Sequence, residues 1–220
     1  ALVTIIKLGI CTGAEARTTL AMLRNGVNTV RSTSAGRLFD AVSAMLGVRY
    51  ASTFEGEAAM ELQFAAEKYE PGDDVPDDGM DSIASDGELC GNAAPEHAPY
   101  VELAEDEESP FVIATDRLFA DLLKRRLAGE DAGVLAYDFH KGLADGIVEA
   151  CEAARDRTGV DAVALTGGTF QNLLLLRLCM QPLRRKGFRV LLHSMIPPND
   201  GGIGLGQAVA AMQALNDGRK

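Results

Sequence analysis

The sequence lacks the features that mark several large classes of protein. Its 220 residues carry 21 basic against 32 acidic side chains, a net charge of −11, so there is no excess of positive charge to bind nucleic acid or an anionic membrane. No apolar run approaches the length needed to span a membrane. We therefore expect neither nucleic acid nor a membrane as a partner. A chain of this length can bury a substantial core, in one or two domains.

Cysteine is scarce, and its spacing pairs no two residues. Cys11, Cys90, Cys151 and Cys179 form no C-x-x-C motif, which argues against a zinc ribbon and against a redox pair. Cys151 and Cys179 fall within helical patterns and are expected to be buried thiols. This usage fits the reducing environment of the cytoplasm. No Ser/His/Asp or Cys/His nucleophile arrangement emerges from spacing, so the catalytic residues stay unknown.

A glycine pair follows a short apolar run in the second half of the chain. Residues 160–165 (VDAVAL) have the pattern of a strand that is buried on both faces. Gly167 and Gly168 follow, and glycine lets the backbone turn tightly and lets a ligand approach the main chain. Residues 172–185 then predict a helix whose first N–H groups are suited to a phosphate or ribose oxygen. The apolar side of this helix is expected to consist of Leu173, Leu174, Leu176 and Leu178.

The same pattern is then repeated. Residues 188–193 predict a second strand, residues 197–202 (PPNDGG) a second glycine turn, and residues 203–215 a closing helix. Ligands of such α/β sheets lie at the carboxyl ends of the strands, where both turns would meet. A single Gly-Gly is most simply a turn. Two such turns, one with a carboxamide and one with a carboxylate, favour a nucleotide or metal site.

The first half of the chain contributes two further candidates. Residues 35–46 predict a helix that ends at Gly47, with Asp40 one turn after Gly36. From spacing alone, a solvated carboxylate explains Asp40 equally well. Residues 53–59, which include Gly56, start another helix that runs to about residue 68.

The middle of the chain carries less chemistry. Residues 69–110 are acidic and rich in glycine and proline, which predicts a solvated loop or insert. A hairpin is expected from residues 100–103 and 111–115, and helices from 117–128 and 132–154. His140 is expected to be a packed or surface histidine without a catalytic role. His193, which ends a strand one loop before Asp200, is a candidate for supporting the site.

Three blocks of sequence resemble a known family. Residues 166–172 (TGGTFQN) and 197–208 (PPNDGGIGLGQA) look like the C-terminal region of HypF, the hydrogenase-maturation carbamoyltransferases. Residues 32–47 (STSAGRLFDAVSAMLG) agree with it. The same blocks are similar, more distantly, to TsaD, the tRNA threonylcarbamoyladenosine transferases. Three blocks in the right order make a specific signal, which covers most of the chain from Ser32 onward.

The resemblance implies a fold. HypF and TsaD share an α/β, actin-like ATPase (RNase H-like) domain in which two lobes clamp a nucleotide. Residues 1–220 look like a C-terminal portion of that domain: most of the second lobe, with residues 69–110 as an insert and a last helix that would return to the first lobe. The family's first-lobe phosphate loop, a strand followed directly by Asp-x-Gly, and its His-x-x-x-His metal motif do not occur in this sequence. We therefore expect an enzyme of which this chain is an incomplete part.

The resemblance also implies a reaction. HypF uses carbamoyl phosphate and ATP to make carbamoyl-adenylate, and transfers the carbamoyl group to the C-terminal cysteine of HypE, on the way to the cyanide ligands of nickel–iron hydrogenases. By this resemblance Gly167 and Gly168 would cradle the adenylate phosphate, Asp40 and Asn172 would hold adenosine, and Gly56 would line the nucleotide site. Asp200 would bind a divalent metal ion, whether Zn, Fe or Mg.

Two other functions stay open. One is a TsaD-type tRNA-modifying transferase, against which the acidic charge and the PPND block both argue. The other is a non-catalytic module that holds a nucleotide or docks a partner through its acidic insert.

Overall fold

The structure is a computed structural model that describes residues 2–69, 101–103 and 111–218. Most of the acidic segment expected over residues 69–110 lies outside these residues, as do Cys90 and His97. The helices are α1 Leu2–Lys7, α2 Gly13–Asn25, α3 Ala35–Leu46, α4 Glu57–Glu67, α5 Thr115–Leu127, α6 Ala132–Thr158, α7 Leu173–Arg185 and α8 Ile203–Asp217. The strands are β1 Val101–Leu103, β2 Phe111–Ile113, β3 Ala162–Ala164 and β4 Arg189–Leu191, and short 3-10 turns η1 Gly168–Gln171 and η2 Asp200–Gly202 precede α7 and α8.

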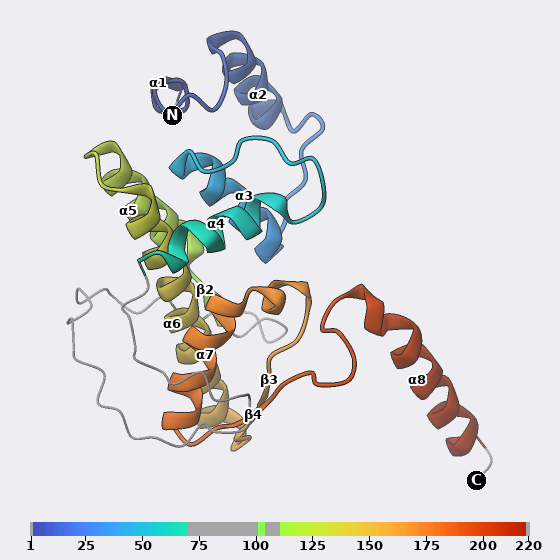
Figure 1. Cartoon of the computed structure of the whole chain (residues 1–220). Coiled ribbons are helices and arrows are strands. Elements are labelled where there is room, and N and C mark those ends of the chain that lie inside the picture. The colour runs from blue at the N-terminus through green and yellow to red at the C-terminus, as the bar shows by residue number, and fades with distance from the viewer. Residues whose placement is uncertain (1, 70–100, 104–110, 219–220) are drawn as a thin grey trace.

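The long helix α6 is the centre of the molecule, with α3, α4, α5 and α7 packed against it (Figure 1). Its first turn is capped by Asp131, whose carboxylate accepts hydrogen bonds from the N–H groups of Gly133 and Val134. It ends at Gly159, which adopts the left-handed conformation at φ 73°. The buried face of α6 follows the helical period and supplies Leu135, Ala136, Phe139, His140, Leu143, Ala144 and Val148.

Helix α3 forms where the sequence predicts it. It begins after Ser34, ends at Gly47 with φ 80°, and buries Phe39, Val42 and Met45 against α6 and α4. Helix α7 is capped by Asn172 and buries Leu174, Leu175, Cys179 and Leu183. The expected inward position of Leu173 is wrong, because its side chain is 56% exposed. Burial raises the pKa of the Cys179 thiol to about 12, so the expected buried thiol is confirmed.

The two predicted strands after α6 pair in parallel, with Val163 opposite Val190. Val163 and Val190 pack against the core, whereas Ala164 and Leu191 face outward. The expectation of a strand buried on both faces is therefore wrong: this sheet has two short strands in the described part of the chain, and helices cover one face of it. The other predicted pair, β1 and β2, forms the expected antiparallel hairpin.

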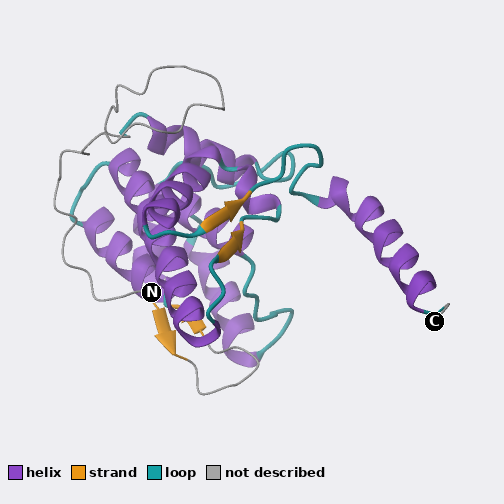
Figure 2. Ribbon diagram, turned by 90° about the horizontal axis from the view of Figure 1, so that it is seen from below, coloured by secondary structure: helices purple, strands orange, loops and turns teal. Residues whose placement is uncertain are grey.

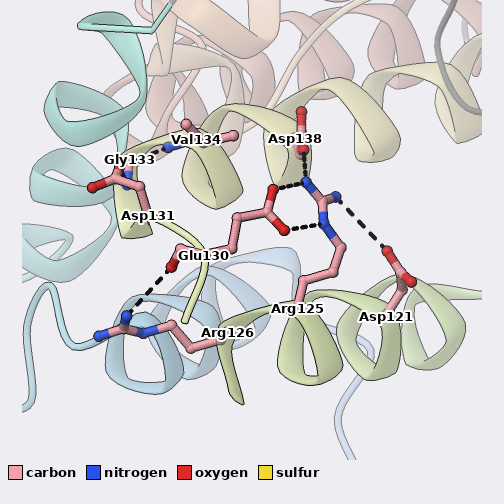
Figure 3. Close-up of polar contacts among 8 residues, drawn as sticks. All are labelled: Asp121, Arg125, Arg126, Glu130, Asp131, Gly133, Val134 and Asp138. Atoms are coloured by element: carbon pink, nitrogen blue, oxygen red, sulfur yellow. Dashed lines mark hydrogen bonds and ion pairs between the residues drawn. The ribbon is translucent and has the colours of Figure 1, made fainter. Parts of the chain in front are cut away.

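Arg125 on α5 forms an ion pair with Asp138 on α6, which links the two helices (Figure 3). Its guanidinium donates to the carboxylates of Glu130 and Asp138, and Asp121 lies 3.8 Å away. These contacts raise the pKa of Arg125, mainly through Glu130, and lower that of Glu130. The charges are partly exposed, so the network orders the α5–α6 junction more than it stabilises the fold.

Helix α8 differs from all the others. It projects away from the body of the molecule in both views (Figures 1 and 2), and every one of its side chains is exposed. Its apolar residues range from 51% exposed at Leu205 to 68% at Leu215. No helix within the described segments has the length and apolar character to cross a membrane.

Candidate functional site

The two glycine turns lie at the same edge of the molecule. Because β3 and β4 run parallel, their carboxyl ends meet, and the chain leaves both strands side by side. A hydrogen bond of 2.7 Å between Thr166 Oγ1 and His193 Nε2 joins the two exits. His193, a candidate for supporting the site, thus contacts the residue that starts the Gly167–Gly168 turn.

The first turn contains two glycines with different reasons for being glycine. Gly167 adopts φ 96° and ψ 160°, a region that is open essentially to glycine alone. Gly168 begins η1 with an ordinary backbone, and a Cβ there would meet only the Gln171 side-chain oxygen at 3.9 Å. Within the part of the chain that the structure describes, neither the backbone nor the packing explains why residue 168 is a glycine.

The glycines of the second turn are explained by their own loop. A Cβ on Gly201 would lie 3.1 Å from Asn199 Oδ1, and one on Gly202 would lie 3.0 Å from the Ile196 side chain. Asn199 shapes this loop by accepting a hydrogen bond of 3.0 Å from the Gly201 N–H. Asp200, the predicted metal ligand, begins η2 and is exposed.

Asn172 is half-buried at the start of α7, with both ends of its carboxamide engaged. Its Oδ1 accepts a hydrogen bond of 2.9 Å from the Leu175 N–H, which caps the helix. Its Nδ2 lies 2.9 Å from Nε2 of His140 on α6. The residue predicted to hold adenosine is thus fixed by two contacts within the chain.

His140 is fully buried among aromatic rings. Its Nδ1 lies 2.7 Å from the Ala136 carbonyl, and its ring meets those of Phe39 and Phe139 edge-on, with centroids 5.4 and 5.6 Å away. Burial lowers the pKa of His140 to about 4, so the ring is neutral near pH 7. Of the two environments expected for His140, packed or surface, the structure shows the packed one.

The rings of Phe39, Phe139 and His140 and the carboxamide of Asn172 form one corner of the molecule, and Asp40 follows Phe39 on α3. It pairs with Arg37 at 2.8 Å, and its side chain is 31% exposed. Its neighbour Phe39 packs against His140, which in turn contacts Asn172. His140 therefore brings the first sequence block, residues 32–47, together with the glycine-turn block.

Gly56 ends the loop before α4, and hydrogen bonds to Glu57 hold that loop in place. It adopts φ 81° at the N-cap of that helix, a conformation that favours glycine. The next residue, Glu57, is buried and accepts hydrogen bonds from the Thr53 N–H and from Arg49. The bond from the Thr53 backbone is the main cause that lowers the pKa of Glu57.

The chain does not supply a complete metal site in the part that the structure describes. No group of three His, Cys, Asp or Glu side chains that could hold a metal ion occurs there. Asp200 would be a single carboxylate, and one ligand holds a divalent cation weakly. No chemical step is therefore assigned to a metal on this chain.

His140 is the residue of this site that the sequence analysis missed: it joins Asn172 to the aromatic core. Its contact with Asn172 spans 32 positions of sequence, which no local spacing reveals. The one available signal was its place on the apolar face of α6, since a buried polar ring needs hydrogen-bond partners.

Comparison with known families decides the identity of this fold. The model of the family described as "Carbamoyltransferase, Kae1-like Domain, second subdomain" matches residues 5–207. The chain belongs to this family.

Relatives agree with the assignment. The chain is 34% identical over 191 residues to the carbamoyltransferase HypF of Rhodobacter capsulatus, an alignment that covers 86% of this chain and 21% of that protein. It is 32% identical over 209 residues to a carbamoyltransferase HypF homolog of Cupriavidus necator, covering 94% of this chain and 48% of the relative. It thus spans between about a fifth and a half of the length of these relatives.

A solved structure shares the fold. The crystal structure of full-length HypF in the phosphate- and nucleotide-bound form matches with a TM-score of 0.73 at 30% identity, covering 93% of this chain and 23% of that one. The predicted α/β lobe of the HypF and TsaD type is confirmed.

Proposed function

We propose that this chain is the nucleotide-binding second lobe of an ATP-dependent carbamoyltransferase of nickel–iron hydrogenase maturation. The family match and the relatives named carbamoyltransferase HypF support this. So does the related full-length HypF that was solved with phosphate and nucleotide bound. Because the chain spans only part of such proteins, the activity belongs to the longer polypeptide, to which this lobe would contribute its share of the site.

The observation that carries the proposal is the absence of a side chain at residue 168, at a position where the described fold would tolerate one. Gly167 is explained by its backbone, and Gly201 and Gly202 by their packing, but among the described residues a Cβ on Gly168 would meet only the Gln171 side-chain oxygen, at 3.9 Å. A glycine that its own fold does not require is suited to the close approach of a ligand. Gly168 begins η1, which leads into α7, and the start of a helix favours an anion. We place the adenylate phosphate there.

The remaining site residues then take roles around that phosphate. Asn172 and Asp40 would hold adenosine, and Gly56 would line the same site. In the transfer step, the sulfur of a thiolate attacks the carbamoyl carbon, the carbon–oxygen bond to the adenylate phosphate breaks, and AMP leaves. Backbone N–H groups of the turn that begins at Gly167 would stabilise the charge that builds on the departing phosphate.

The other components are proposed from the family resemblance. The acceptor would be the C-terminal cysteine of a HypE-like partner, and carbamoyl phosphate and ATP would be the small substrates. Asp200 would give one carboxylate to a divalent metal ion, with its other ligands outside this chain. The last helix, α8, would pack on the first lobe, which accords with its exposed apolar residues. A cytoplasmic location stays a prediction.

Calorimetric titration of the full-length protein with ATP tests the proposal. We expect Gly168→Ala to weaken ATP binding about tenfold or more, because its methyl group occupies the ligand's space, while the free energy of unfolding changes by less than about 1 kcal/mol. Val160→Ala is the control, since Val160 is exposed and precedes β3, whereas Gly168 follows it. ATP affinity in Gly168→Ala equal to that of the native protein would contradict the site.

An activity assay on the native full-length protein separates a transferase from a binding module. We expect the native protein to transfer a carbamoyl group from carbamoyl phosphate to a cysteine-terminated peptide in an ATP-dependent manner, as mass spectrometry of the peptide would record. Nucleotide binding without transfer would favour the non-catalytic module.

A further inference from the structure

The contacts of His140 define a chain of hydrogen bonds with one direction. A carbonyl can only accept, so His140 Nδ1 must carry the proton that it donates to the Ala136 oxygen, 2.7 Å away. In the neutral ring Nε2 is then an acceptor, and Asn172 Nδ2 donates to it over 2.9 Å. At the other end of the carboxamide, Asn172 Oδ1 accepts from the Leu175 N–H. Each bond fixes the polarity of the next.

These hydrogen bonds permit a single orientation of the Asn172 carboxamide. If the amide were flipped, its NH₂ group would face the Leu175 N–H, and its oxygen would face an unprotonated His140 nitrogen. Donor would meet donor and acceptor would meet acceptor, in a place where an unmet polar group is costly. Because burial holds the pKa of His140 near 4, the ring stays neutral and the orientation persists at pH 7. Glu67 on α4 is the charged group that acts on this ring, and it opposes the shift.

His140 cannot itself move to accommodate another orientation. Its ring is fully buried and is held edge-on by Phe39 of α3 and Phe139 of α6, whose own rings pack 4.9 Å apart. The histidine is thus a rigid support that reaches from the core to the half-buried Asn172.

The carboxamide keeps some capacity for a ligand. Its NH₂ group has a second hydrogen and its oxygen a second lone pair, beyond those used by His140 and Leu175. With the amide fixed, an incoming ligand meets a donor at Nδ2 and an acceptor at Oδ1, never the reverse. We infer that His140 is a positioning residue of the nucleotide site, which orients the Asn172 carboxamide for the adenosine moiety. This rests on the function proposed above.

The experiment is a titration of the full-length protein with ATP, using a matched pair of variants. In His140→Gln the longer amide can still donate to the Ala136 carbonyl and accept from Asn172, whereas in His140→Asn it is one methylene too short to reach. We expect His140→Asn to weaken ATP binding about tenfold, the scale of one oriented hydrogen bond, and His140→Gln to stay within about threefold of the native protein. All titrations are run well below each variant's melting temperature.

A double-mutant cycle with Asn172→Ala completes the test. Once the carboxamide is gone there is nothing to orient, so adding His140→Asn should weaken ATP binding no further. A full additional loss in the double variant would overturn the inference, as would equal affinities of His140→Gln and His140→Asn. If Asn172→Ala itself binds ATP like the native protein, the adenosine assignment fails and this inference fails with it. A weakened Asn172→Ala beside an unaffected His140→Asn removes the positioning role alone.

Discussion

The corner around His140 and the C-terminal helix α8 are opposites within one chain. At the corner, α3 and α6 bury aromatic rings, and hydrogen bonds engage both ring nitrogens of His140 and both polar atoms of the Asn172 carboxamide. In α8, apolar residues such as Met212 and Leu215 are 65% and 68% exposed. The corner is complete within this chain, whereas α8 presents an apolar surface that the described residues do not cover. The part of the proposed site that lies at this corner is therefore preformed within the described residues.

The largest expected effect comes from removing a core ring. Phe139→Ala should lower the free energy of unfolding of this chain by about 3–5 kcal/mol, because it leaves a cavity between α3 and α6. Met212→Ala on α8 should change it by less than about 0.5 kcal/mol, since the side chain buries little. Urea denaturation measures both. A comparable loss in Met212→Ala would show that α8 packs on the body after all.

His140 gives the corner a pH dependence that the exposed region lacks. Its pKa is about 4 in the folded chain against 6.5 as the ordinary value, so the unfolded chain binds a proton that the folded chain does not. Stability is unaffected above pH 6.5 and falls by about 3 kcal/mol as the pH drops to 4. His140→Gln removes this component. The free energy of unfolding of the native chain should therefore fall relative to that of His140→Gln as the pH drops from 6.5 to 4. Two parallel stability curves in urea titrations at each pH would contradict the buried neutral ring.

The glycine pair tests the difference between a structural and a ligand-facing position. Gly167→Ala should cost about 1–3 kcal/mol of stability, because φ 96° and ψ 160° are strained for any side chain. Gly168→Ala should cost less than about 1 kcal/mol, since its added Cβ makes only an ordinary contact with the Gln171 side-chain oxygen, at 3.9 Å. Thermal unfolding of the two variants compares them directly. Equal losses would mean that Gly168 has a structural role as well.

The sequence predicted the helices better than the sheet. Helix α3 was bounded correctly because Gly47 adopts the left-handed conformation that ends a helix. The strand at residues 160–165 was expected to be buried on both faces, yet Val160 is 57% exposed. An apolar run reveals that a strand can be covered, and tertiary packing decides which face is. Likewise the run of four leucines after Asn172 could not tell that Leu175, and not Leu173, points inward.

The candidate site was predictable to the extent that its members are close in sequence. Gly167, Gly168 and Asn172 occupy one turn, as expected. Their link to the Asp40 block passes through Phe39 and His140, which are 101 positions apart in the chain and meet only because α3 packs on α6. The family resemblance supplied roles for these residues, which stay predictions, but no spacing rule supplies that contact.

The smallest expected effect on stability concerns the charged rim of the same corner. Arg37 is 68% exposed and pairs with Asp40, so Arg37→Gln should change the free energy of unfolding by less than about 0.5 kcal/mol. If Asp40 binds the ribose, that pair competes with the ligand, and Arg37→Gln should leave ATP affinity of the full-length protein equal or up to about threefold higher. Asp40→Asn should instead lower it, by about tenfold, because a neutral amide replaces the charged acceptor of the ribose hydroxyls. Calorimetry on both variants separates the roles: if Asp40→Asn binds ATP like the native protein, Asp40 is a solvated helix carboxylate, and the ribose contact lies elsewhere along this edge.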